Sequence, residues 1–282
     1  MEEFHYRLPF VARDPRPGHH RSSVSGAGLE FVGHVPLIAA SDARRLDVRA
    51  TLARPMQDWV VRRYRQRSVA NVWLVADLSA SIGFHGEHDK TETLARLAAS
   101  IGFSAWRTGD RFGFVGCDES VRHDWFVAPT RQAAVATDTA RRLRSARPRG
   151  SGAAGLLDAT RHLGSQRGLV FLASDWHLPL EQMDRVLSGL ARHEVVPLVL
   201  WDRRELDPGP GIGLVSVADP ESGARRTLLM RPRLRARIVA AMAQRREDIE
   251  STCRKHGRRA LFMLDGFHPD RLTSHFFGGG AR

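Results

Sequence analysis

The sequence has few of the features that mark disulfide-bonded, thiolate-metal or membrane proteins. Its 282 residues include only two cysteines, Cys117 and Cys253, which lie far apart and support neither a disulfide framework nor a thiolate zinc site. No apolar run approaches the ~18–20 residues that a membrane span requires. The N-terminus, MEEFHYRLPF, is acidic at once and lacks the apolar core of a signal peptide. We therefore expect a cytoplasmic protein with no membrane span.

Lysine is nearly absent, although the net charge is +12 and the pI is about 11.2. Lys90 and Lys255 are the only lysines, so arginine supplies nearly all of the basic charge along the whole chain. Aromatic residues make up only 7%, few for a base-stacking platform, and no nucleic-acid-binding module is recognisable. Because a GC-rich genome also produces an arginine bias, we do not expect nucleic acid as a partner. An acidic protein partner stays open.

From residue 72 onward, apolar segments alternate with amphipathic ones. Strands are predicted at 72–78, 111–119, 121–129, 168–175 and 195–202, and helices at 90–107, 131–146, 154–164 and 179–193. Further along, a β region with a turn at 219–223 precedes a helix at 232–256, a strand at 260–266 and a short closing helix. This alternation predicts an α/β fold with a doubly wound, mostly parallel sheet that is covered on both faces.

Composition also suggests how the chain is organised. Residues 1–36 are rich in Pro, Gly, Ser and His and are expected to form an irregular arm. Residues 37–70 are predicted to be an accessory β segment, with β-like pieces at Leu46–Ala50 and Trp59–Tyr64. Residues 71–202 form the predicted core, and 203–282 a β/α extension that completes the same domain.

The long C-terminal helix is expected to pack on the sheet through an apolar stripe. This stripe consists of Leu234, Ile238, Val239 and Met242. The basic face of the helix is either solvated or meets an acidic partner, and the sequence does not distinguish these two roles.

The stretch VWLVADLSASIG, residues 72–83, begins as a buried strand and ends on oxygen-bearing side chains. Asp77, Ser79 and Ser81 follow at every second position, which places them on one side of an extended chain. Asp175 ends another apolar run, GLVFLASD. Since sites in open α/β sheets form beyond the carboxyl ends of the strands, we expect the two acids to share one site. Hard oxygen donors of this kind suit Mg²⁺, Ca²⁺ or Mn²⁺.

The pattern D-x-S-x-S after an apolar strand resembles the metal-ion-dependent adhesion site of von Willebrand factor A domains. Asp77, Ser79 and Ser81 match its first motif, and Asp175 matches its last acid. The resemblance implies that the serines bind the ion directly, whereas the acids act mainly through water. It also implies a von Willebrand factor A-like fold.

The middle motif departs from that pattern. The family places a threonine before a helix, but the corresponding stretch here, GSGAAGLLDA, has Ala154 at that position. Ser151 is the only hydroxyl nearby and is the expected substitute as a metal ligand. We therefore expect a divalent cation that is weakly bound or absent.

A wider set of motifs resembles the MoxR-associated branch of von Willebrand A-like proteins, over about residues 28–280. Its G-x-E-F element matches Gly28–Phe31, an acidic and arginine-rich stretch matches Asp42–Ala50, and a basic R-x-Y element matches Arg63–Arg65. The resemblance implies a non-enzymatic adaptor or chaperone-like protein that acts with a MoxR-type AAA+ ATPase in maturation of, or metal insertion into, a client enzyme. The start Tyr6–Pro9 resembles accessory proteins of methanol-oxidation clusters, which implies calcium loading of methanol dehydrogenase.

Two other interpretations stay open. A serine-type or metal-assisted hydrolase could use the same pocket, with His177 as a base near Ser79, although L-S-A-S is not a G-x-S-x-G elbow. Alternatively, the two serines only cap the turn after the strand, and Asp77 only accepts hydrogen bonds from loop amides. The chain has no phosphate-binding G-x-x-x-x-G-K-[ST] loop, so an ATPase partner would supply any ATP energy.

Overall fold

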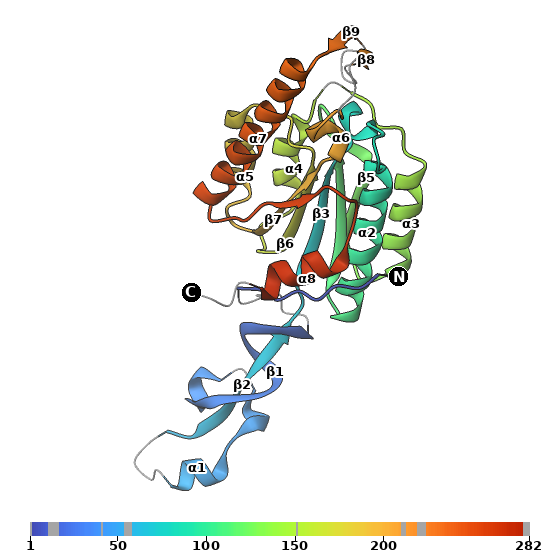
Figure 1. Cartoon of the computed structure of the whole chain (residues 1–282). Helices are drawn as coiled ribbons and strands as arrows, with labels where there is room; N and C mark the ends of the chain where they lie inside the picture. The colour runs from blue at the N-terminus through green and yellow to red at the C-terminus, as the bar shows by residue number, and fades with distance from the viewer. Residues whose placement is uncertain are drawn as a thin grey trace. The chain divides into compact units, whose positions relative to one another are not determined.

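The computed structural model describes residues 2–10, 17–40, 42–53, 58–150, 152–209, 213–218 and 224–278. It divides into two compact units (Figure 1). The larger unit comprises Met1–Arg7 with Asn71–Arg282, and the smaller one comprises Leu8–Ala70. In the described parts, no helix combines the length and apolar character needed to cross a bilayer.

The larger unit is built on a six-stranded sheet. Its strands are β3 (Asn71–Asp77), β4 (Arg111–Cys117), β5 (Val121–Thr130), β6 (Leu169–Ser174), β7 (Glu194–Leu200) and β10 (Leu261–Met263). They run in the order β10-β7-β6-β3-β4-β5, and all are parallel except the edge strand β5. Numbered along the chain, this is the 3-2-1-4-5-6 order of doubly wound α/β proteins. The predicted fold class is confirmed.

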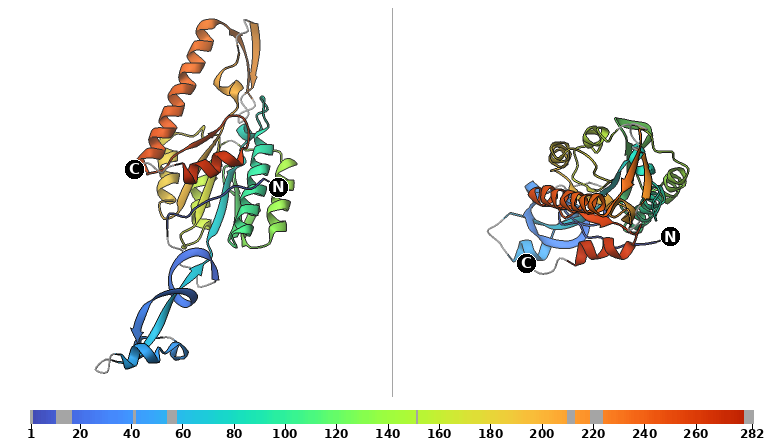
Figure 2. Two further views of the ribbon diagram at one scale, coloured as in Figure 1. Left: turned by 60° about the horizontal axis from the view of Figure 1, so that its bottom comes forward. Right: turned by 45° about the horizontal axis from the view of Figure 1, so that its top comes forward.

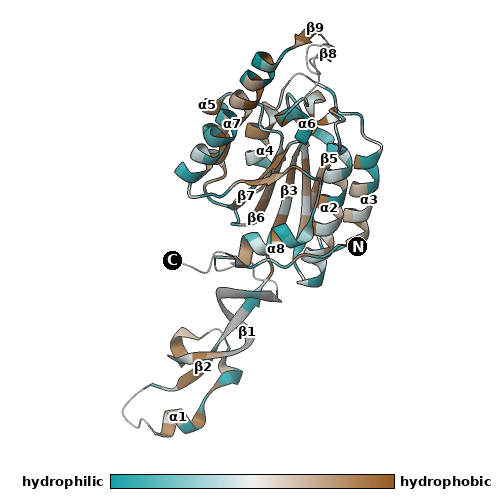
Figure 3. Ribbon diagram, in the orientation of Figure 1, coloured by the Kyte–Doolittle hydropathy of each residue, from teal (hydrophilic) through white to brown (hydrophobic). Residues whose placement is uncertain are grey.

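Helices cover both faces of the sheet (Figures 1 and 2). They are α2 (Lys90–Arg107), α3 (Ala133–Arg144), α4 (Gly155–His162), α5 (Leu180–Gly189), α6 (Arg203–Leu206), α7 (Pro232–Lys255) and α8 (Pro269–Phe277). α2 and α3 pack together on one face, whereas α4, α5 and α7 contribute to the core on the other. The strands are correspondingly hydrophobic along their length, as Figure 3 shows. Burial on both faces explains why the sequence shows continuous apolar runs rather than alternation.

The N-terminal segment differs from the irregular arm expected over 1–36. Residues 2–8 form neither helix nor strand, but Phe4 is buried with its ring 5.6 Å from that of Phe171 in β6. The Tyr6 hydroxyl donates a hydrogen bond of 2.5 Å to Asp110. Tyr6 belongs to the YRLP start, so this element has a structural role as an anchor on the larger unit.

The smaller unit contains a long antiparallel ribbon of β1 (Pro17–Pro36) and β2 (Val60–Ser68), with α1 (Val48–Leu52). Residues 17–36 are thus strand, where the sequence suggested an irregular arm. Four register shifts interrupt the ladder, and such shifts remove the period-two pattern by which a strand is recognised. The β-like piece expected at Leu46–Ala50 is instead the start of α1, which Asp47 caps by accepting from the Ala50 amide at 3.0 Å.

The C-terminal extension also differs in part. β8 (Gly213–Ala218) and β9 (Arg225–Met230) form a two-stranded sheet of their own beside the start of α7 (Figures 1 and 2). The predicted turn at 219–223 lies outside the described residues. Within α7, Met242 packs against the core, but Val239 is 40% exposed, and the buried residues are Ile249 and Cys253. The predicted stripe is therefore wrong at Val239, whereas Leu234 and Ile238 are half-buried, and the fully buried contacts of the helix lie in its second half.

Close packing at the sheet gives one stability prediction. Gly113 in β4 lies opposite Trp73 in β3, and a Cβ at Gly113 would lie 2.6 Å from the indole ring. We expect Gly113→Ala to lower the free energy of unfolding by about 1–3 kcal/mol, measured by urea denaturation. Gly213→Ala is the matched control, because a Cβ there meets nothing within 4 Å. Identical unfolding curves for both variants would contradict this packing.

Candidate functional site at the strand tips

The two predicted acids lie at the tips of neighbouring strands. Asp77 is the last residue of β3, and Asp175 follows the last residue of β6. β3 and β6 pair in parallel as far as Ala76 and Ala173. The chain leaves β3 toward β4 on one side and returns to β6 on the other, so the strand order reverses between these two tips. In doubly wound sheets this reversal marks the usual position of a binding crevice.

Asp77 and the two serines form a connected group. Asp77 Oδ1 accepts from the Ser79 amide at 2.9 Å, and its Oδ2 accepts from the Ser174 hydroxyl at 2.7 Å. The hydroxyls of Ser79 and Ser81 form a hydrogen bond with each other at 3.1 Å. Asp77 and Ser79 are buried, whereas Ser81 is half-buried and gives the group access to solvent.

The serines converge for a different reason from the one the spacing suggested. Ala80–Gly83 is a short 3₁₀ turn, so the motif leaves the extended conformation directly after Ser79. The turn, rather than a period-two strand, brings the two hydroxyls together. Ser79 occupies the N-cap position but its side chain makes no capping hydrogen bond. Simple capping therefore does not account for its hydroxyl.

Asp175 has an oxygen whose hydrogen-bonding capacity is unused. It is 1% exposed, and its Oδ1 accepts from the His177 amide at 3.2 Å. Its Oδ2 is buried and receives no hydrogen bond from any described residue. A buried carboxylate oxygen in this state is costly, and such exceptions in native proteins often indicate a bound ion or a functional role.

The backbone beside Asp175 is strained. Trp176 has φ = 56°, in the left-handed region that bulky residues avoid. The conformation is held in place because the Trp176 amide donates to Ser174 Oγ at 2.9 Å and its indole N–H donates to the Leu198 carbonyl at 3.0 Å. Strain of this kind concentrates at functional sites, and here these hydrogen bonds hold the backbone next to Asp175.

Asp202, after β7, shows what a purely structural acid looks like in the same sheet. Its Oδ2 accepts from the amides of Glu87 and His88, each at 2.8 Å, and its Oδ1 accepts from the Arg204 amide at 2.9 Å. Asp202 thus caps α6 and holds the loop before α2. Asp175 directly follows the neighbouring strand β6 but lacks such donors at Oδ2.

A buried lysine completes the site, although no sequence motif marks it as a site residue. Lys90 is 3% exposed; its ammonium lies 2.6 Å from Glu205 Oε1 and 3.7 Å from Asp175 Oδ2. Glu205 is held in turn because its Oε2 accepts from the Asp202 amide at 2.8 Å. One signal was visible: Lys90 is the first residue of a helix, where the helix dipole disfavours a cation.

The electrostatic balance of the site is negative. The ammonium of Lys90 pairs with Asp175 and Glu205, and Arg245 interacts electrostatically with Asp175, but no described cationic side chain pairs with Asp77. Burial, followed by the charge of Asp175, raises the pKa of Asp77 to about 6. An added positive charge would relieve both the repulsion between the acids and the cost of their burial.

The residues present fit a divalent cation that keeps most of its water. The donors are hard oxygens, and Asp175 Oδ2 has a free lone pair. The loop of the middle motif does lie beside the first motif, since the Ala80 amide donates to the Gly150 carbonyl at 3.3 Å. However, Ala154 is exposed and offers no side-chain oxygen, and Ser151 lies outside the described residues. Where the structure is described, no group of three or more His, Cys, Asp or Glu side chains is gathered as a metal cluster.

The structure does not bring Ser79 together with any histidine that it describes, as a serine hydrolase would require. The hydroxyl of Ser79 is bonded to Ser81, not to a histidine. His177 is exposed, and its ring stacks on Trp201 at 6.1 Å between centroids. Cys117 is buried in β4, and burial raises the pKa of its thiol well above the ordinary range.

The strand order and the strand-tip motif together define a von Willebrand factor A-like α/β domain. Residues 39–248 match the family described as "Protein of unknown function DUF58", and the chain belongs to this family.

Two proteins of similar sequence and one solved structure can be compared with this chain. An uncharacterized protein of Mycobacterium tuberculosis is 29% identical over 252 residues, which cover 87% of this chain and 78% of that protein. A Paracoccus denitrificans protein named "Uncharacterized protein in moxR 3'region" is 34% identical over 95 residues, or 34% of this chain and 90% of that protein. The crystal structure of the conserved hypothetical protein BatB from Bacteroides thetaiotaomicron aligns with a TM-score of 0.45 at 12% identity, over 74% of this chain and 98% of BatB.

Proposed function

We propose that the protein is a non-enzymatic, cytoplasmic adaptor that works with a MoxR-type AAA+ ATPase and binds a partner through a divalent cation at the strand tips. The observation that carries this proposal is the buried Asp175 Oδ2, which lacks a hydrogen-bond donor in the described structure. The name of the Paracoccus relative, which places that protein beside moxR, supports the choice of partner.

Within this proposal each side chain has a role. The hydroxyls of Ser79 and Ser81 hold the ion, and Asp77 and Asp175 contact it through water; Ser151 remains the predicted replacement for the missing threonine. The bound ion, Mg²⁺, Ca²⁺ or Mn²⁺, supplies a positive charge with an open position for a carboxylate of the partner. Ser81, the half-buried member, marks the side from which the partner approaches.

The client enzyme is a further part of the proposal. The ATPase and this adaptor would act together on the maturation of a client, for example by promoting insertion of its metal. The resemblance of Tyr6–Pro9 to accessory proteins of methanol-oxidation clusters, of the MxaS type, makes calcium loading of methanol dehydrogenase the specific prediction.

Calorimetric titration of Mg²⁺, Ca²⁺ and Mn²⁺ into chelator-treated protein tests the ion site. We expect binding that Asp77→Ala abolishes and that Asp138→Ala, a change at an exposed acid of α3, leaves intact. Pull-down of the MoxR-type ATPase should then require the same ion and fail in EDTA. Turnover of generic esters that Ser79→Ala abolishes would contradict the proposal and favour the hydrolase.

A further inference from the structure

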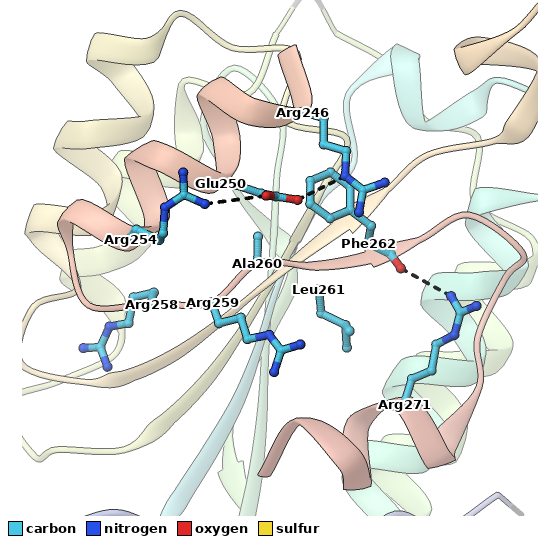
Figure 4. Close-up of a pocket in the computed structure, with 9 residues that line it drawn as sticks. All are labelled: Arg246, Glu250, Arg254, Arg258, Arg259, Ala260, Leu261, Phe262 and Arg271. Carbon is cyan, nitrogen blue, oxygen red and sulfur yellow. Dashed lines mark hydrogen bonds and ion pairs between the residues drawn. The ribbon is translucent and has the colours of Figure 1, made fainter. Parts of the chain in front are cut away.

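A second candidate site lies away from the strand tips. It is formed by the last three elements of the chain. It is a cavity of about 670 Å³ between the second half of α7, the edge strand β10 and α8 (Figure 4). Its lining consists of Arg246, Glu250, Arg254, Arg258, Arg259, Ala260, Leu261, Phe262 and Arg271. Five arginines thus face a single acid, and none of these residues belongs to the strand-tip site.

Three of the arginines are already neutralised. Arg246 lies 3.0 Å from Glu250, and Arg254 lies 2.6 Å from Glu247. Arg258 pairs with Glu194 at 3.0 Å. These ion pairs fix the wall of the cavity that α7 and the following turn provide.

The positive charges of the other two arginines are not fully balanced by acidic side chains. Arg259 makes no ion pair or hydrogen bond with any part of the chain that the structure describes. Arg271 donates to the Phe262 carbonyl at 3.4 Å and forms a 3.5 Å ion pair with Asp265, an acid that it shares with Arg203. In Figure 4 these two guanidinium groups lie on either side of Leu261. Two available guanidinium groups in a cavity of this size can bind two anionic groups of one ligand.

The floor of the cavity indicates which kind of anion it suits. Ala260, Leu261 and Phe262 are apolar, and the ring of Phe262 lies under the guanidinium of Arg246 at 4.5 Å. Phosphate sites are commonly formed by backbone amides of glycine-rich loops, and this lining contains no glycine. Side-chain guanidinium groups around an apolar floor fit carboxylates that flank an aliphatic side chain.

We propose that this cavity binds an acidic peptide segment of a partner protein. Its carboxylates pair with Arg259 and Arg271, and an aliphatic side chain between them packs on Leu261 and Phe262. The site is independent of the strand-tip site, so the protein has two separate surfaces for partners. It also gives a specific role to part of the arginine excess of the chain.

Fluorescence anisotropy with a labelled peptide of four glutamates around one leucine tests the proposal. We expect the double variant Arg259→Gln/Arg271→Gln to bind this peptide at least about tenfold more weakly than the unchanged protein. Arg233→Gln, at an exposed arginine near the start of α7, is the matched control and should leave the affinity unchanged. Replacing the leucine of the peptide by glycine should also weaken binding.

Other results would overturn the proposal. An equal loss in Arg233→Gln would show attraction to the overall charge rather than to this cavity. Stronger binding of ATP or inorganic phosphate than of the peptide, lost in the same double variant, would make the cavity a phosphate site. Asp77→Ala should bind the peptide normally, so the outcome is separate from that of the strand-tip site.

Discussion

Replacing Lys90 by methionine is expected to raise the affinity of the strand-tip site for Mn²⁺ by about tenfold or more. The ammonium lies 3.7 Å from the Asp175 oxygen that we assign to the cation, and it is buried, so water screens it poorly. Two unit charges about 4 Å apart interact by roughly 4 kcal/mol at an effective dielectric constant of about 20. Removing this charge removes a competitor for Asp175 and a source of repulsion against the ion. Titration of Mn²⁺ followed by electron paramagnetic resonance measures the effect.

Glu205 provides the matched variants for this experiment. It holds the ammonium at 2.6 Å, so Glu205→Gln leaves Lys90 with Asp175 alone and should lower the affinity for Mn²⁺. Removing one partner of a buried pair also costs about 3–5 kcal/mol of stability. The double variant Lys90→Met/Glu205→Gln avoids an unpaired Glu205 and should still bind Mn²⁺ more tightly than the unchanged protein. An unchanged affinity in Lys90→Met and in the double variant would mean that the cation does not bind beside Asp175.

The sequence predicted the sheet and its helices well because each element there has a local signal. The range predicted for α2, 90–107, agrees with the structure, since Asp89 caps its first turn and its buried residues recur with helical spacing. β3 and β6 are buried on both faces, so each appears in the sequence as a continuous apolar run. This run alone predicts the strand, without reference to its neighbours in the sheet. The smaller unit lacks such signals: the ladder of β1 and β2 changes register repeatedly, and no single period survives.

The strand-tip acids show where sequence reasoning stops. Asp77, Asp175 and Asp202 each follow an apolar strand, and topology alone places the first two at neighbouring tips. What separates Asp175 from Asp202 is the supply of amide donors from distant segments, which no local pattern encodes. The Lys90–Glu205 pair likewise joins residues 115 positions apart. Such contacts form only when the chain folds, so no local sequence pattern predicts them.

Asp77→Asn is expected to change the pH dependence of stability, because burial and the negative charge at the strand tips raise the pKa of Asp77. Burial and Asp175 raise the pKa of Asp77 from 3.8 to about 6, so the folded protein holds a proton there that the unfolded chain releases. This contribution to stability is present in full below about pH 4, is lost as the pH rises toward 6 and is absent above it. Asparagine does not titrate. Relative to the unchanged protein in EDTA, we therefore expect Asp77→Asn to gain on the order of 2–3 kcal/mol between pH 4 and pH 7.5, measured by urea denaturation.

Divalent cations should reverse that order at pH 7.5. Ionised Asp77 destabilises the fold because no cationic side chain in the described part of the chain pairs with it, and Mg²⁺ bound at the strand tips would supply a balancing charge. Saturating Mg²⁺ should therefore raise the urea concentration at which half of the unchanged protein is unfolded. The same midpoint for Asp77→Asn should stay where it was in EDTA. Asp138→Asn, at the exposed acid on α3, should follow the unchanged protein under both conditions. If Asp77→Asn kept the original pH profile, the buried charge at the end of β3 would not be the source of the instability, and the argument for a cation at the strand tips would lose its electrostatic support.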